Sequence, residues 1–181
     1  MGELRRLHTG DFDRFYEVLL DSFPPDELRS RAEHKALLDR PDYRVYAHYE
    51  EDELLAFLTV WTMEGFSFVE HFAVRSDRRG SGLGSRLLGK LQSTLKTRLF
   101  LEAELPDTEL ARRRIGFYER NGFYKNDYPY IQPPMEPGKN PVPMCIMTTH
   151  GPVDERVFEK LRSSLYNIVY EGKMQSSTVI R

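Results

Sequence analysis

The sequence predicts an α+β (mixed α/β) fold, in which helices cover both faces of one mixed sheet. The spacing of apolar residues changes several times between three or four residues, typical of helices, and two, typical of strands. In chain order, the expected elements neither alternate strictly between strand and helix nor separate into blocks. The chain has 181 residues, of which 40% are hydrophobic. That is enough to bury the core of a single domain without disulfides.

The first forty residues are expected to form a short strand, over residues 4–7, and two helices. The first helix is predicted because apolar residues recur at intervals of three and four until Pro24 and Pro25 break the pattern. These apolar residues are Phe12, Phe15, Leu19 and Phe23. A second helix is expected from about Asp26 to Leu38.

The middle of the chain predicts an antiparallel meander. Residues 43–49, 54–62 and 66–74 are rich in aromatic and β-branched residues, and short polar turns separate them. A helix follows whose leucines fall on one stripe. They are Leu83, Leu87, Leu88, Leu91 and Leu95.

The last third predicts three strands and two helices. Residues 98–105 form the first strand, and a helix over 107–120 ends at Asn121-Gly122. Residues 123–130 and 143–149 are the other candidate strands. Five prolines between 131 and 143 predict a loop or an interrupted edge. A terminal helix is expected over 153–170, and the last ten or so residues are expected to fray.

Composition argues against several classes of protein. The net charge is −2, whereas sequence-independent nucleic-acid binding needs an excess of Lys and Arg. The densest apolar stretch, residues 54–61, is far shorter than the ~20 residues of a membrane span. The start of the chain lacks the apolar core of a signal peptide, and the histidines show no metal-ligand spacing. We therefore expect a cytoplasmic soluble protein with no metal and no nucleic-acid or membrane partner.

The segment that predicts chemistry is a glycine-rich turn between a strand and a helix. The strand, residues 66–74, leads into Arg79-Gly-Ser-Gly-Leu-Gly84, and the predicted helix begins there. Glycines allow positive φ angles and close approach of a ligand. The N–H groups of such a turn and the positive end of the helix dipole together favour an anion such as a diphosphate.

Two other nucleotide-binding motifs fit this turn less well. A Walker A loop needs Gly-Lys-Ser/Thr, and Leu83-Gly84-Ser85 lacks the lysine. A dinucleotide-binding fingerprint needs G-x-G-x-x-G early in a βαβ unit. Here the spacing is G-x-G-x-G, and three meander strands precede it.

The sequence resembles the GNAT superfamily of acyl-CoA-dependent N-acyltransferases. Arg79–Gly84 fits the phosphate motif of the family, [Arg/Gln]-x-x-Gly-x-[Gly/Ala], and Ile115–Phe123 fits its helix ending in Tyr-Glu-x-x-Gly-Phe. The resemblance implies a mostly antiparallel sheet of about six or seven strands. It also implies a GNAT-like domain over residues 1–150, on which a helix and tail, residues 151–181, pack.

By this resemblance, the diphosphate of acetyl-CoA is expected on the N–H groups of Arg79–Gly84, with Ser85 nearby. The pantetheine arm is expected to pair with the backbone of residues 72–74. Where many relatives have Asn-x-x-Ala, this chain has Ala111 and Arg114. Arg112, Arg113 or Arg114 therefore becomes a candidate contact to CoA phosphates, and Arg114 is the one chosen here. The expected acetyl-CoA contacts are Phe72, Ala73, Val74, Arg79, Gly80, Ser81, Gly82, Leu83, Gly84, Ser85 and Arg114.

Two residues are candidates for catalysis. Tyr118 matches the family tyrosine that lies near the thiol sulfur, where a phenol can protonate the departing thiolate. Its alternative role is a packed aromatic at a helix end. Glu70 is the candidate base, because a carboxylate in an apolar strand must be paired, hydrated or shifted in pKa. Pairing with an arginine is its alternative, and strand alternation predicts that His71 faces the other way.

The predicted function is transfer of acetyl from acetyl-CoA to a primary amine by direct attack in a ternary complex. The alternative is a non-catalytic acyl-CoA-binding regulatory module. The acceptor, a small molecule or a peptide, is left open. A homodimer is also left open, since many relatives are dimers and the terminal helix has an apolar stripe. Cys145 is expected in the core rather than as a nucleophile.

Overall fold

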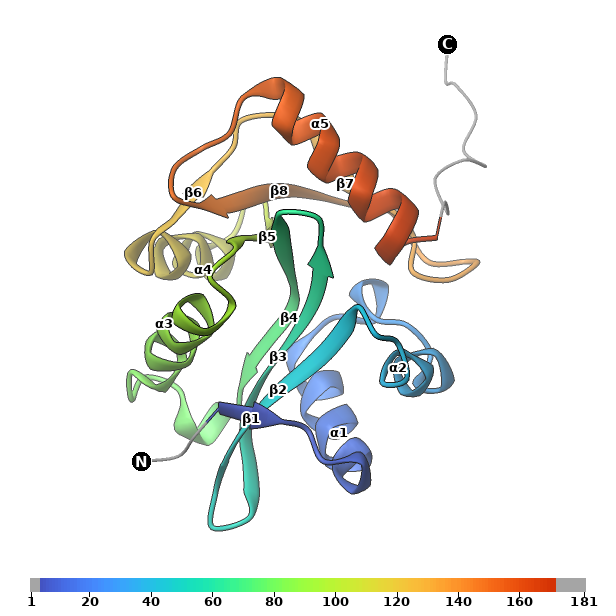
Figure 1. Cartoon of the computed structure of the whole chain (residues 1–181), viewed down its shortest axis with the longest axis vertical. Coiled ribbons are helices and arrows are strands. Elements are labelled where there is room, and N and C mark those ends of the chain that lie inside the picture. The colour runs from blue at the N-terminus through green and yellow to red at the C-terminus, as the bar shows by residue number, and fades with distance from the viewer. Residues whose placement is uncertain (1–3, 172–181) are drawn as a thin grey trace. The chain divides into compact units, whose positions relative to one another are not determined.

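We describe a computed structural model of the chain, in which residues 4–171 are described (Figure 1). These residues divide into two compact units. The first contains residues 4–24 and 30–101, and the second contains residues 25–29 and 102–171. The described residues form eight strands in a mixed, mostly antiparallel sheet with helices, which confirms the predicted α+β class. The tail that was expected to fray lies outside the described residues.

The first unit is built on the predicted meander. β1 (Leu4–Arg6), β2 (Tyr43–Glu50), β3 (Glu53–Met63) and β4 (Phe66–Val74) pair antiparallel in that order. β5 (Arg98–Glu104) pairs parallel with β4 and runs on into the second unit. α3 (Leu83–Leu95) makes the crossover between those two parallel strands.

Helices cover both faces of this part of the sheet. α1 (Phe12–Ser22) and α2 (Arg31–Leu37) lie on one side of β2–β4, and α3 lies on the other (Figure 1). The eight consecutive residues 54–61 of β3 are all buried. A strand exposed on one face would alternate between buried and exposed positions. The apolar stretch of β3 is therefore the centre of a core that extends to both sides of the sheet.

The second predicted helix is wrong in its first half. In place of the first half of this helix, the chain forms a short 3₁₀ turn, η2 (Pro25–Glu27). The helix α2 begins at Arg31. The reason is a capping box at Ser30, whose hydroxyl accepts from the Glu33 N–H while the Glu33 carboxylate accepts from the Ser30 N–H. The cap starts a new helix and leaves η2 and residues 28–29 outside it.

In the second unit, β8 (Val142–Thr149) pairs with two short strands, β6 (Phe123–Lys125) and β7 (Tyr130–Gln132). β6 pairs with residues 147–149 and β7 with residues 142–144. The single strand predicted over 123–130 is therefore interrupted, and part of the predicted proline loop is strand. The unit also contains α4 (Glu109–Arg120) and α5 (Glu155–Ser164), which continues as the π-helix η4 (Leu165–Val169).

Asn126 explains the interruption between β6 and β7. Its side chain is buried, with 2% of the residue exposed. The amide group donates to the Ile146 carbonyl at 3.0 Å and to Thr148 Oγ1 at 3.1 Å, and its oxygen accepts from the Val153 N–H at 2.8 Å. One side chain thus links the end of β6, the middle of β8 and the approach to α5.

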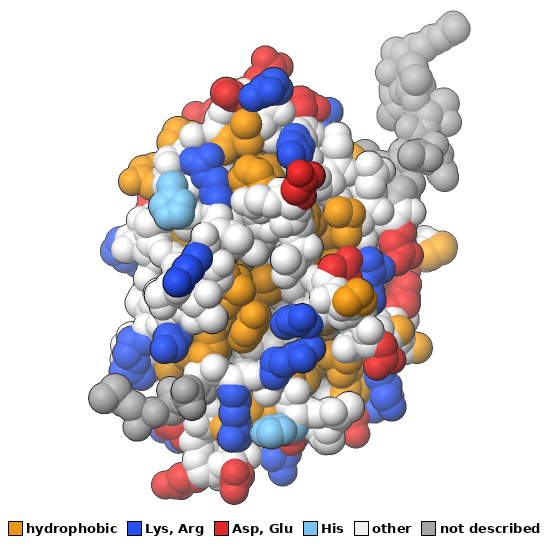
Figure 2. All heavy atoms as spheres, viewed as in Figure 1, with side chains coloured by type: hydrophobic (Ala, Val, Ile, Leu, Met, Phe, Trp, Pro, Cys, Tyr) orange, Lys and Arg blue, Asp and Glu red, His pale blue; other side chains and the backbone are white. Residues whose placement is uncertain are grey.

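Figure 2 shows basic and acidic side chains interspersed over one face of the molecule, in keeping with the net charge of −2. Within residues 4–171, no helix has the length and apolar composition needed to cross a membrane.

Replacing Asn126 by Ala is expected to destabilise the fold by about 2–4 kcal/mol, because three buried hydrogen bonds are lost and their partner groups stay buried. Urea unfolding measures this loss. Asn121→Ala is the matched control, since it removes one half-buried bond to the Phe117 carbonyl and should cost about 1 kcal/mol. Equal losses in the two variants would contradict this account of Asn126.

Candidate active site

The glycine-rich turn of the first unit has the backbone that its sequence predicts. After β4, the chain passes through the turn η3 (Ser76–Arg78) and enters α3. Gly80 and Gly82 have φ angles of 80° and 77°, in the region that favours glycine. A Cβ at either position would meet no atom within 4 Å, so the space beside both is open. Gly84 differs, because it lies inside α3.

The first turn of α3 directs its N–H groups out of the helix. The first intrahelical bond runs from the Arg86 N–H to the Gly82 carbonyl at 3.2 Å. The N–H groups of Leu83, Gly84 and Ser85 precede it and have no carbonyl one turn earlier within the helix. No acidic residue occupies this first turn, so no side chain there offsets the positive end of the helix dipole.

The side chains of Arg79 and Ser81 stabilise the turn by hydrogen bonds to backbone carbonyls. The Arg79 Nε donates to the Val74 carbonyl at 2.9 Å, and the Ser81 hydroxyl donates to the Arg78 carbonyl at 2.8 Å. The Arg79 N–H bonds to the Ser76 carbonyl. The residues present therefore fit a diphosphate held by backbone N–H groups. The expected roles of Arg79–Ser85 and of the β4 residues Phe72, Ala73 and Val74 stay predictions.

A β-bulge in β4 changes the geometry expected around Glu70. Thr59 pairs with His71, and the next residue of β3, Val60, pairs with Val69. Glu70 is therefore the extra residue on its strand. Alternation predicts that Glu70 and His71 point to opposite faces. Instead, the carboxylate Oε2 lies 3.8 Å from the His71 Nδ1, because the bulge rotates one side chain relative to the next.

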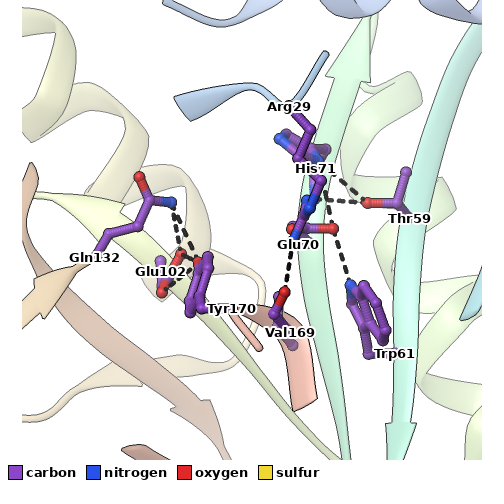
Figure 3. Close-up of polar contacts among 9 residues, drawn as sticks. All are labelled: Arg29, Thr59, Trp61, Glu70, His71, Glu102, Gln132, Val169 and Tyr170. Carbon is purple, nitrogen blue, oxygen red and sulfur yellow. Dashed lines mark hydrogen bonds and ion pairs between the residues drawn. The ribbon is translucent and has the colours of Figure 1, made fainter. Parts of the chain in front are cut away.

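The Glu70 carboxylate is enclosed. Its side chain is 1% exposed, and the indole N–H of Trp61 donates to it at 2.8 Å (Figure 3). His71 is oriented by Thr59, whose hydroxyl oxygen accepts from the His71 N–H at 2.9 Å. The structure thus shows a tryptophan and a histidine beside this carboxylate, where sequence reasoning expected an arginine as the alternative. A catalytic role for Glu70 stays a prediction.

In the second unit, Tyr118 lies in the last turn of α4. Its ring packs edge-on against Phe117 and Phe123, with centroids 5.4 and 5.8 Å away. Burial raises the pKa of its phenol to about 12. The charge of Arg114 acts in the opposite direction, and that of Glu27 adds to the rise. The hydroxyl therefore carries its proton at neutral pH and is a hydrogen-bond donor. Its catalytic role stays a prediction.

Arg114, one turn before Tyr118, is paired with an acid of β5. Its Nη1 lies 2.5 Å from the Glu104 Oε2, and both side chains are partly exposed. Sequence reasoning expected this guanidinium to contact CoA phosphates. The ion pair gives Arg114 a partner inside the second unit, and the CoA contact stays a prediction.

Glu27 was missed by sequence reasoning, which placed it near the start of the helix expected from about Asp26 to Leu38. It lies in η2 with 9% of its surface exposed. Burial raises the pKa of its carboxyl from 4.5 to about 7, and the charges of Glu104, Glu102 and Asp26 add to the rise. Arg114 lowers the pKa. No local pattern signals this pKa shift, because three of the four charges that act on Glu27 lie 75 or more positions further along the chain.

Glu102 is the centre of a second network that the sequence did not signal. Its carboxylate accepts hydrogen bonds from the hydroxyls of Tyr130 and Tyr170, the latter at 2.7 and 2.9 Å to the two oxygens. The Gln132 amide donates to it at 3.0 Å (Figure 3). Burial and the charge of Glu102 hold the pKa of Tyr130 well above its ordinary value. The network joins β5, β7 and the end of η4.

Glu27 should make stability depend on pH. The unfolded chain ionises this carboxyl near pH 4.5 and the folded chain near pH 7, so stability falls as pH rises between these values. The fall amounts to about 3 kcal/mol, at 1.36 kcal/mol per pKa unit. Glu27→Gln is expected to unfold at higher urea concentration than the wild type at pH 8, but not at pH 4.5. The exposed Glu109→Gln is the control, and an equal effect of Glu27→Gln at both pH values would contradict the assignment.

Comparison with known proteins agrees with this geometry. The model of the Acetyltransferase (GNAT) family matches residues 12–123. "Putative acetyltransferase YjbC" of Bacillus subtilis (strain 168) is 34% identical over 113 residues, which are 60% of this chain and 56% of that protein. This chain thus matches little more than half of that relative's length.

Solved structures of acetyltransferases are also similar to this chain. The "Putative acetyltransferase from GNAT family from Bacteroides thetaiotaomicron" is 35% identical with a TM-score of 0.84, covering 93% of this chain and 98% of that one. The PaiA N-acetyltransferase from Thermoplasma acidophilum, in complex with coenzyme A, has a TM-score of 0.61 at 15% identity, covering 82% and 98%. That identity supports the fold alone. The family model and the Bacteroides structure each match most of the chain, which therefore belongs to the acetyltransferase (GNAT) family.

Proposed function

We propose that this protein is an N-acetyltransferase that moves the acetyl group of acetyl-CoA to a primary amine by direct attack in a ternary complex. The observation that carries the proposal is the turn before α3, where two glycines with positive φ precede a helix start free of acidic side chains. Such a turn binds a diphosphate through N–H groups and a helix dipole, without a lysine.

The proposal gives each candidate residue a role. Arg79–Ser85 bind the diphosphate, the backbone of residues 72–74 pairs with the pantetheine arm, and Glu70 is the candidate carboxylate base. Tyr118 is the candidate proton donor to the thiolate, since its phenol, with a pKa of about 12, is protonated at neutral pH. Arg114 is a candidate contact to CoA phosphates. The acceptor is a small-molecule or peptide amine, and the proposed location is the cytoplasm.

A thiol-release assay with acetyl-CoA and a panel of primary amines tests the proposal. Release of CoA that depends on an amine supports it. Binding of CoA without release across the whole panel would instead identify a non-catalytic acyl-CoA-binding module. Product mass, higher than that of the amine by one acetyl group, distinguishes transfer from hydrolysis.

Gly82→Val should remove most of the stabilisation of the fold by acetyl-CoA. Acetyl-CoA at 100 times its dissociation constant should stabilise the wild type by about 2.7 kcal/mol. A side chain at φ 77° distorts the turn, so the variant should lose most of this shift in thermal unfolding. Gly65→Val is the matched control, because Gly65 has a φ of 76° and open space in the β3–β4 hairpin. An undiminished shift in Gly82→Val would place the diphosphate elsewhere.

Tyr118→Phe should lower kcat by about 10²-fold or more, the usual contribution of a general acid, while the thermal shift with acetyl-CoA stays close to that of the wild type. Tyr124→Phe is the control, because it removes an exposed tyrosine hydroxyl that belongs to the same unit but lies on β6 rather than on α4. A Tyr118→Phe enzyme with wild-type kcat would show that the phenol is only a packed aromatic.

A further inference from the structure

We propose that Trp61 is a positioning residue for the acetyl transfer: its indole N–H orients the Glu70 carboxylate and stabilises the ionised form of this base. The inference rests on the proposed function, in which Glu70 is the candidate base, and adds a residue that the sequence did not single out. Both residues belong to the first unit, Trp61 on β3 and Glu70 on β4. The role follows from a direct hydrogen bond, the bulge that allows it and the contacts that hold the indole.

Glu70 lies on the strand along which the pantetheine arm is proposed to run. β5 pairs with β4 at residues 66–69, and Glu70 follows directly. The glycine-rich turn comes after the C-terminal end of β4. In the proposed function, the arm runs from that turn back along residues 74 to 72. Because Phe72 and Glu70 are only about 7 Å apart along an extended strand, this direction brings the thioester end of the arm toward Glu70.

Two contacts of Glu70 involve the same carboxylate oxygen. The Trp61 indole N–H donates to Oε2 at 2.8 Å, and the His71 Nδ1 lies 3.8 Å from it (Figure 3). An N–H donor forms a stronger bond with an ionised carboxylate than with a neutral acceptor. The Glu70 side chain is 1% exposed, so little water reaches the carboxylate. Losing the indole donor should therefore disfavour the ionised form.

The β-bulge turns two consecutive side chains of β4 toward one face of β3. Thr59 and Trp61 are two residues apart on β3 and therefore point to the same face. The Thr59 hydroxyl lies 3.4 Å from the His71 Nδ1, and Trp61 donates to Glu70. In a regular strand, neighbouring side chains point to opposite faces. The bulge thus gives Glu70 a donor that strand alternation would deny it.

The indole is held in place by its own neighbours. Tyr43, its register partner on β2, packs edge-on against it with ring centroids 5.0 Å apart. The Arg40 guanidinium lies over the indole, 4.9 Å from the ring centroid. Asp42 accepts two hydrogen bonds of 2.9 Å from that guanidinium. Trp61 itself is 1% exposed. The indole N–H therefore cannot turn away from Glu70 without breaking these contacts.

Other titratable and charged groups of the first unit lie close to this pair. His71 follows Glu70 on β4, and the His34 ring of α2 packs against the His71 ring with centroids 5.8 Å apart. Arg40 lies over the indole, and Asp42 is paired with it. A pH profile must therefore show that Glu70, and not a histidine, is the group that titrates.

The first test removes the N–H donor and keeps the shape of the side chain. Trp61 is the one tryptophan of the chain, so growth on an analogue replaces this residue alone. 3-Benzothienylalanine has a sulfur atom in place of the indole N–H, whereas 4-fluorotryptophan keeps the N–H. kcat/KM is measured between pH 5.5 and 9.5 with acetyl-CoA and the two fastest of four amines: spermidine, putrescine, benzylamine and glycinamide. A midpoint common to both amines belongs to the enzyme.

In the benzothienylalanine enzyme, the acid-side midpoint of kcat/KM should move up by about 1–2 pH units, the effect of one hydrogen bond to a charged group. Activity lost below the midpoint should return above it, because the carboxylate still ionises there. KM for acetyl-CoA should stay the same. The 4-fluorotryptophan enzyme should keep the wild-type midpoint.

Tryptophan fluorescence gives a second readout that needs no turnover. Because the indole N–H donates to the carboxylate, the emission of Trp61 in the wild type should change with pH at the same midpoint as kcat/KM. In Glu70→Gln, both the emission change and the acid-side midpoint should disappear. Glu64→Gln, at an exposed position of the β3–β4 hairpin, is the matched control and should keep both.

Three results would overturn the role of Trp61 while leaving acetyl transfer intact. The first is an unchanged midpoint with benzothienylalanine. The second is a loss of activity that is equal at every pH, which would mean that the indole only fills space. The third is a midpoint that persists in Glu70→Gln, which would assign the titration to another group.

Absence of amine-dependent CoA release by the wild type with all four amines would overturn the proposed function and, with it, the role of Trp61. A thermal shift with acetyl-CoA equal to that of the wild type shows that each altered protein is folded and binds its cosubstrate.

Discussion

The constraint on which the functional part of this structure depends is the cost of burying a carboxylate. An ionised carboxylate removed from water must be given hydrogen-bond donors or must hold its proton more tightly. Glu70 receives the Trp61 indole N–H and lies beside His71. Glu102 receives two tyrosine hydroxyls and the Gln132 amide. At Glu27, burial and the charges of neighbouring acids raise the pKa of the carboxyl to about 7.

The proposed function makes different demands on backbone and side chains. In that proposal, the turn before α3 offers backbone N–H groups to a diphosphate, a ligand that is already charged and needs no proton transfer. This role depends on backbone conformation, which is why the positive φ angles of Gly80 and Gly82 matter to it. The proposed role of Tyr118 instead depends on a side chain whose pKa is raised by burial.

Sequence reasoning succeeded where the signal is local. The meander from β2 to β4, the crossover helix α3 and the glycine positions follow from spacing, turn residues and positive φ, which neighbouring residues determine. It missed one local signal, the Ser30–Glu33 capping box that starts α2. Elsewhere it failed where a distant partner decides, as at Asn126, whose side chain bonds to residues 20 and 27 positions further along where β6 ends. The bulge at Glu70 arises from its register with β3, which no spacing within β4 records.

The sequence alone determined the family, the fold class and the glycine-rich turn before α3, because each is recorded in the order and spacing of nearby residues. Tertiary structure decided which acids are buried. The sequence places Glu27 in a helix expected from about Asp26, whereas the structure places it in the turn η2, where its carboxyl is buried. Hydrogen bonds join residues 26, 28 and 29 of this segment to positions 140, 139 and 169. The pKa of a carboxyl depends on solvent and charges in three dimensions. The chain order does not contain that information until the fold brings the residues together.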